Sequence, residues 1–137
     1  AKNIFAQNLV MSSPNLDRVL RIKTSSLRGG TIENIYLRNI EVATYKESAI
    51  RCNMFYENPG DFMPIIKNIR VENMKVKDGG KYGLLNNAYE ESPVENLQLI
   101  NCEINGVEIP VEADHYKNLI FDKVSTNGKT VEAPEKK

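Results

Sequence analysis

The segment "IENIYLRNIEV", Ile32 to Val42, decides the fold because the chain repeats its pattern. "IKNIRVENMKV" (Ile66 to Val76) and "VENLQLINCEI" (Val94 to Ile104) have the same order of apolar residues and asparagines. Looser copies lie at residues 1–11 and 116–126. The first asparagines of successive copies are 31, 34, 28 and 22 residues apart. Such spacings predict a solenoid, in which each turn of the chain packs on its neighbours.

Within one copy the apolar residues alternate with polar ones, as they do in a half-buried β-strand. We expect Ile35 and Leu37 to point inward and Tyr36 and Arg38 to point outward. The phase restarts after Asn39, which predicts two short strands separated by a bend. Asparagine suits such a bend because it tolerates the left-handed backbone conformation.

The second asparagine of each copy should lie above its equivalent in the next turn. We therefore expect the side-chain amides to bond one another along the axis in a ladder. The ladder should stop near the C-terminal end, where Lys123 takes the place of asparagine. Its expected members are Asn8, Asn39, Asn73 and Asn101.

A third strand-like segment lies between successive copies, bounded by turn-forming Gly, Pro, Asn and Ser residues. These segments are "RVLRIKT", "SAIRCNMFY", "YGLLNNAY" and "GVEIPVEA". Three strands per turn predict an all-β fold, a parallel β-helix of about four to five coils over residues 1–131, followed by a polar tail at 132–137. Because the chain starts inside a repeat, we expect the β-helix to be incomplete at its N-terminal end. A preceding part of the same protein, or self-association with a second copy, would cover that end.

Composition restricts the classes of function. The 137 residues include 18 Lys and Arg and 18 Asp and Glu, so no overall charge favours nucleic acid or an anionic membrane surface. No apolar run reaches the roughly 20 residues of a transmembrane helix, and the N-terminus lacks the pattern of a targeting signal. Cys52 and Cys102 are expected to be buried small hydrophobic residues rather than a disulfide or metal site. No cofactor-binding or metal-binding motif is present.

Two cations in "VLRIK" are conspicuous in a chain without net charge. Arg21 and Lys23 are two residues apart, so in a strand they project from the same face about 7 Å apart. Like charges so placed are unfavourable unless an anion lies between them, and arginine can grip a carboxylate with two hydrogen bonds. The alternative is a solvated strand face whose cations pair with Glu residues of a neighbouring coil.

Other candidate residues carry weaker signals. Tyr56, in "CNMFYENPG", could form a flat wall for a sugar ring or could simply pack at the surface. His115, the only histidine, follows Asp114 in a turn and is more typical of a solvated residue than of a catalytic one.

Glycosidases need two carboxyl groups that face one bond. The candidates, all in or beside loops, are Asp17, Glu57, Asp61, Glu90 and Glu91. No pair stands out by its spacing, so the chain contains no self-sufficient active site and we assign it no catalytic residue.

The stretch "RVLRIKTSSLRGGTIENIYLRNIEV", residues 18–42, resembles a segment of the polygalacturonase-like enzymes of glycoside hydrolase family 28. That segment contains an Arg-Ile-Lys motif, a glycine pair and the following coil. The resemblance continues through the repeat pattern and "NMFYE", a form more similar to bacterial members than to fungal ones.

The resemblance implies a right-handed parallel β-helix that hydrolyses α-1,4 linkages of galacturonic acid in pectin, with inversion, in a secreted or periplasmic protein. By position, Arg21 and Lys23 match the family's substrate-binding pair, and Tyr56 matches a tyrosine of the same cleft. The family's partner ligand would be an acidic polysaccharide such as pectin or an oligogalacturonide.

The family's catalytic motifs, Asn-Thr-Asp, an Asp-Asp pair and Gly-His-Gly, would precede the Arg-Ile-Lys strand and do not occur in this sequence. The chain is therefore expected to correspond to the C-terminal part of such an enzyme, inactive without the N-terminal part. Two alternatives stay open. One is a noncatalytic β-helix module that binds acidic polysaccharide or serves as a spacer, and the other is a related enzyme for another uronate or rhamnose linkage.

Overall fold

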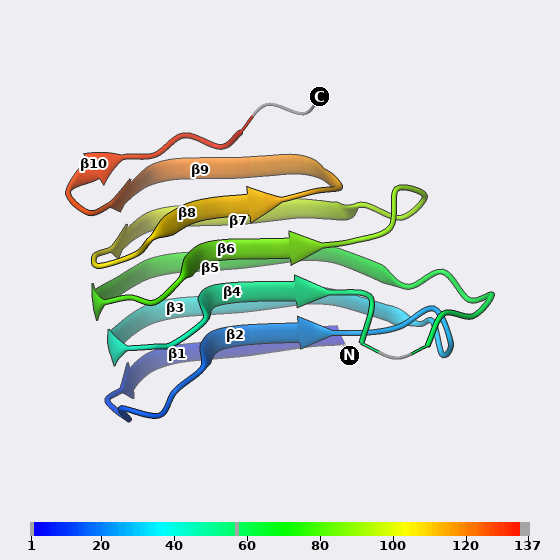
Figure 1. Ribbon diagram of the computed structural model, residues 1–137, viewed down its shortest axis with the longest axis horizontal. Helices are drawn as coiled ribbons and strands as arrows, with labels where there is room; N and C mark the ends of the chain where they lie inside the picture. The colour runs from blue at the N-terminus through cyan, green and yellow to red at the C-terminus, as the bar shows by residue number, and fades with distance from the viewer. Residues whose placement is uncertain (1, 57, 135–137) are drawn as a thin grey trace.

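The computed structural model describes residues 2–56 and 58–134. The chain winds into a parallel β-solenoid of about four turns, which confirms the expected all-β fold (Figure 1). The described residues form no helix. Accordingly, this part of the chain offers no helix with the length and apolar character needed to cross a membrane.

Two sheets form the solenoid, and the chain alternates between them. The larger has the strand order β1-β3-β5-β7-β9-β10 and the smaller has the order β2-β4-β6-β8. The larger comprises β1 (Lys2–Met11), β3 (Thr31–Thr44), β5 (Ile65–Asp78), β7 (Val94–Ile104), β9 (Tyr116–Thr126) and β10 (Lys129–Thr130). The smaller comprises β2 (Arg18–Lys23), β4 (Ser48–Asn53), β6 (Tyr82–Asn87) and β8 (Ile109–Ala113). Stacked strands are parallel throughout, except that β10 turns back antiparallel on β9.

The repeat copies form single long strands, where the sequence predicted two short strands in each copy. In β3 the pairing with β5 continues from Thr31 to Thr44, although the backbone bends twice, at Asn34 and Asn39, each with φ of 58°. The predicted bend at Asn39 is therefore present, and a second bend at Asn34 accompanies it. Strand pairing survives because the stacked strands bend at equivalent positions and stay in register.

Asparagine amides line both bends. Asn39 Nδ2 donates to Asn8 Oδ1 at 3.0 Å, and Asn73 Nδ2 donates to Asn39 Oδ1 at 2.7 Å. Asn101 extends this ladder to Asn73 at 3.3 Å, and Lys123 follows with φ of 56°. The predicted ladder and its last member are confirmed. A second ladder, which the sequence analysis missed, joins Asn3, Asn34, Asn68 and Asn96 at 2.8–3.1 Å.

The core lies between the two sheets and consists of inward rows of apolar side chains. Ile35, Ile69 and Leu97 stack in one row and are at most 5% exposed. Cys52 and Cys102 are buried free thiols, as expected. Burial raises the pKa of Cys52 to about 12 and that of Cys102 to about 11.

The first row on the outer face of the larger sheet alternates in charge from coil to coil. Lys2, Glu33, Lys67, Glu95 and Lys117 are in register. Glu33 lies 3.3 Å from the ammonium of Lys2 and 3.5 Å from that of Lys67, and these cations lower its pKa. At the last coil, the Tyr116 hydroxyl donates to the carbonyl of Pro134 at 2.8 Å, so the first residues of the polar tail contact the solenoid.

Candidate functional site

The outer face of the smaller sheet carries the predicted cations. In β2, Ile22 points into the core, so Arg21 and Lys23 on either side of it project outward and are exposed. In β4, Arg51 is in register with Arg21 and Asn53 is in register with Lys23. Stacking therefore places a second arginine beside the first on the same face.

The loop after β4 brings Tyr56 to the same place. The backbone amide of Tyr56 donates to the carbonyl of Thr24 at 3.3 Å, and the amide of Thr24 donates to Asn53 at 2.8 Å. This attachment holds the Tyr56 ring 4.1 Å from Lys23 Nζ and 5.9 Å from the guanidinium carbon of Arg21. The structure thus brings together all three residues proposed to bind substrate.

Hydrogen bonds to Ser26 hold the same loop in place further along the chain. Ser26 accepts from the amide of Phe62 through its carbonyl at 2.8 Å and from the amide of Gly60 through its hydroxyl at 2.9 Å. A Cβ atom at Gly60 would lie 2.7 Å from the Cα of Leu27, so only glycine allows this approach. Tyr56 therefore lies on an anchored loop, and the residue is 48% exposed.

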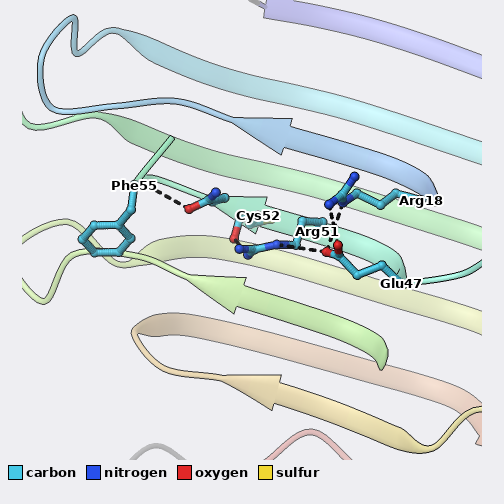
Figure 2. Close-up of polar contacts among 6 residues, drawn as sticks. Arg18, Glu47, Arg51, Cys52 and Phe55 are labelled. Carbon is cyan, nitrogen blue, oxygen red and sulfur yellow. Dashed lines mark hydrogen bonds and ion pairs between the residues drawn. The ribbon is translucent and has the colours of Figure 1, made fainter. Parts of the chain in front are cut away.

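Glu47, just before β4, organises the neighbouring arginines (Figure 2). Arg18 grips its carboxylate with two hydrogen bonds, one of them from Nε at 3.1 Å. Arg51 Nε lies 3.5 Å from the same carboxylate, and Arg51 Nη1 donates to the carbonyl of Cys52 at 2.7 Å. Burial lowers the pKa of Arg51, and the charge of Glu47 opposes this shift.

The charge on this face is unbalanced. Arg21, Lys23 and Arg51 lie on β2 and β4, where the neighbouring carboxylate, Glu47, pairs with Arg18 and Arg51. The other carboxylate of this row is Glu112 on β8, two strands beyond β4. Within residues 2–56 and 58–134, no carboxylate forms an ion pair with Arg21 or Lys23. The two cations instead lie near the face of an aromatic ring, an arrangement worth about 0.5–1 kcal/mol at exposed sites. An anion that binds Arg21 and Lys23 would displace no carboxylate of the described residues.

Sequence reasoning missed the role of Arg51 and Glu47. An alignment of "VLRIK" with "AIRCN" would have placed Arg51 next to Arg21, because both segments alternate in phase and stack in register. The ion pair with Glu47 carries no such signal, since Glu47 lies 29 residues from Arg18 in the chain.

The structure separates Asp17 from the other described candidate carboxylates. Asp17 precedes β2, whereas Asp61, Glu90 and Glu91 follow β4 and β6, at the opposite end of the parallel strands of the smaller sheet. Glu57 lies outside the described residues.

His115 lies in the turn after β8, at the opposite edge of the sheet from β2. Its carbonyl accepts a hydrogen bond from the buried amide of Asn86 at 3.1 Å, which gives it a structural role. In the described part of the chain, no group of three or more His, Cys, Asp or Glu residues could hold a metal ion.

No protein-family model, curated protein or solved structure matches the chain. The resemblance to polygalacturonases therefore rests on the motifs in the sequence. Independently of that resemblance, the outer face of β2 and β4 offers an exposed Arg-Lys pair beside an aromatic ring. Chemically, it can bind a carboxylate attached to a ring that stacks on Tyr56.

Proposed function

We propose that the chain binds an acidic polysaccharide through Arg21, Lys23 and Tyr56. The observation that supports this most directly is the position of Tyr56, whose ring lies 4.1 Å from Lys23 on the face that carries Arg21 and Arg51. Arg21 would take the carboxylate of a uronate residue with parallel hydrogen bonds, and Lys23 would add a point charge. Tyr56 would cover the apolar face of the sugar ring.

Following the sequence resemblance, we propose that the polymer is pectin and that the chain serves in a polygalacturonase-like hydrolase that cleaves α-1,4-galacturonide linkages with inversion. In this proposal the chain supplies substrate-binding residues, and residues outside it supply the catalytic acids. Hydrolysis by an inverting glycosidase needs two carboxyl groups on opposite sides of the bond. A secreted or periplasmic location belongs to the same proposal.

A noncatalytic module that binds the same polymer is the second candidate. It is favoured by the separation of the loop carboxylates, with Asp17 at one end of the smaller sheet and Asp61 at the other. Release of reducing sugar from polygalacturonate by a protein that contains this chain would distinguish the two. Hydrolysis favours the enzyme, and binding without hydrolysis favours the module.

The binding proposal is tested with trigalacturonate and isothermal titration calorimetry. Arg21→Ala should weaken binding about tenfold or more, because a hydrogen bond to a charged group contributes about 1.5–3 kcal/mol. Lys77→Ala is the matched control, since Lys77 is an exposed lysine at the end of β5, in the other sheet. Equal affinities for the wild type and Arg21→Ala would refute the assignment of the carboxylate.

A further inference from the structure

The outer face of the larger sheet contains a second surface with recognisable chemistry. Between its two bends, each long strand turns two side chains outward, and we call this part of the sheet the middle facet. Its outward residues on the first three long strands are Phe5 and Gln7, Tyr36 and Arg38, and Arg70 and Glu72. The smaller sheet lies across the core from this facet, so the surface is separate from the site around Arg21 (Figure 1).

The middle facet differs from the facet before it. There, lysines and glutamates alternate from coil to coil, and each glutamate pairs with a lysine of a neighbouring coil. On the middle facet, by contrast, no carboxylate of the described residues forms an ion pair with Arg38, and Glu72 pairs with Arg70. The Arg38 guanidinium donates to Gln7 Oε1 at 2.9 Å, and Arg70 lies 3.6 Å from Glu72. Each guanidinium has five N–H donors, so both keep donors for a ligand.

An aromatic pair adjoins these arginines. The rings of Phe5 and Tyr36 lie 5.1 Å apart at an angle of 32°, and Phe5 is 72% exposed. At this point the surface has a hollow with a volume of about 740 Å³. Small-ligand sites commonly measure roughly 300–1,000 Å³. Lining the hollow are Phe5, Gln7, Tyr36, Arg38, Arg70 and Glu72.

We propose that this hollow is a second binding site for a uronate residue of the same acidic polysaccharide. Phe5 and Tyr36 supply a flat apolar surface for a sugar ring, and Arg38 and Arg70 supply donors for its carboxylate. Gln7 and Glu72 supply acceptors for ring hydroxyls. The choice of a uronate rests on the proposed function, whereas the site itself rests on the contacts of the middle facet. Two sites on opposite faces would let one molecule hold two polymer segments, which raises the avidity for long chains.

The test is a titration of the isotope-labelled chain with trigalacturonate, followed by amide resonances in nuclear magnetic resonance spectra. The proposal predicts shifts at residues 36–38 and 70–72 in addition to those at 21–23. Phe5→Ala combined with Arg38→Gln should abolish the shifts at 70–72 and leave those at 21–23. Lys75→Gln is the control, because Lys75 lies outward on the same sheet, beyond the bend at Asn73 and in register between Glu41 and Glu103.

The outcomes separate this inference from the proposed function. Shifts at 21–23 alone would overturn the second site and leave the proposed function standing. Shifts at 36–38 and 70–72 alone would support the second site and refute the role of Arg21 and Lys23. Equal shifts at 36–38 with neutral galactotriose would overturn the assignment of a uronate. The wild-type titration gives these results even if the double variant fails to fold.

Discussion

Replacement of Asn39 by alanine tests whether the asparagine ladders hold the solenoid in register. Asn39 makes two ladder bonds, at 3.0 Å to Asn8 and at 2.7 Å from Asn73, and its φ is 58°. Loss of the two bonds costs about 0.5–1.5 kcal/mol each. Alanine in the left-handed conformation adds about 1 kcal/mol. Asn39→Ala should therefore lower the free energy of unfolding by about 3 kcal/mol.

Urea denaturation measures this loss, with the free energy extrapolated linearly to zero denaturant. Asn39→Gly removes the same bonds without the left-handed penalty and should be about 1 kcal/mol more stable than Asn39→Ala. Asn101→Ala should cost about 1 kcal/mol less than Asn39→Ala, because Asn101 has a similar φ, 53°, but makes a single ladder bond, at 3.3 Å. If Asn39→Gly were as stable as the wild type, the ladder bonds would contribute nothing and the reasoning would be refuted.

Further predictions concern Lys123 in the last coil, the buried side chains of Cys52 and Tyr45, and the close contact between Gly83 and Pro110. Lys123→Asn should stabilise the chain by about 1 kcal/mol in the same assay, since asparagine tolerates the φ of 56° better than lysine does; a loss of stability would contradict this. Burial raises the pKa of Cys52 and of Tyr45 to about 12, so only the unfolded chain releases these protons from about pH 9 upward. The stability that these protonated groups contribute should be complete below pH 9 and should be lost as the pH rises towards 12. A free energy of unfolding that does not change between pH 9 and pH 12 would contradict this prediction. Gly83→Ala should destabilise the fold by about 1–3 kcal/mol in urea, because the added Cβ would lie 2.4 Å from the carbonyl oxygen of Pro110, and a neutral effect would show that β8 can move away.

Much of the fold could be predicted because the same strand pattern recurs several times in the sequence. Alternation placed Ile35 and Leu37 inward, and repetition made the stacking unambiguous. The second bend was missed, although its signal is present. Ile32 and Ile35 are three residues apart across Asn34, just as Leu37 and Ile40 are across Asn39. In a strand, inward residues are two apart, so an interval of three marks a bend.

The candidate site was less predictable because it depends on contacts between coils. Arg21 and Lys23 could be placed on one face from their spacing alone. The position of Tyr56 over Lys23 depends on the bond between its amide and Thr24, which lies 32 residues away in the chain. The sequence offered Tyr56 as a possible wall for a sugar ring, and the resemblance assigned it to the same cleft as Arg21 and Lys23. Likewise, the loop carboxylates could not be placed from sequence, because loops of different length set their positions.

A crystal structure of the chain with trigalacturonate would show directly whether Arg21, Lys23 and Tyr56 bind an acidic sugar. We expect a galacturonate carboxylate within hydrogen-bonding distance of Arg21 and Lys23, with its sugar ring against Tyr56. A ligand bound elsewhere, with Arg21 and Lys23 still exposed to solvent, would contradict it.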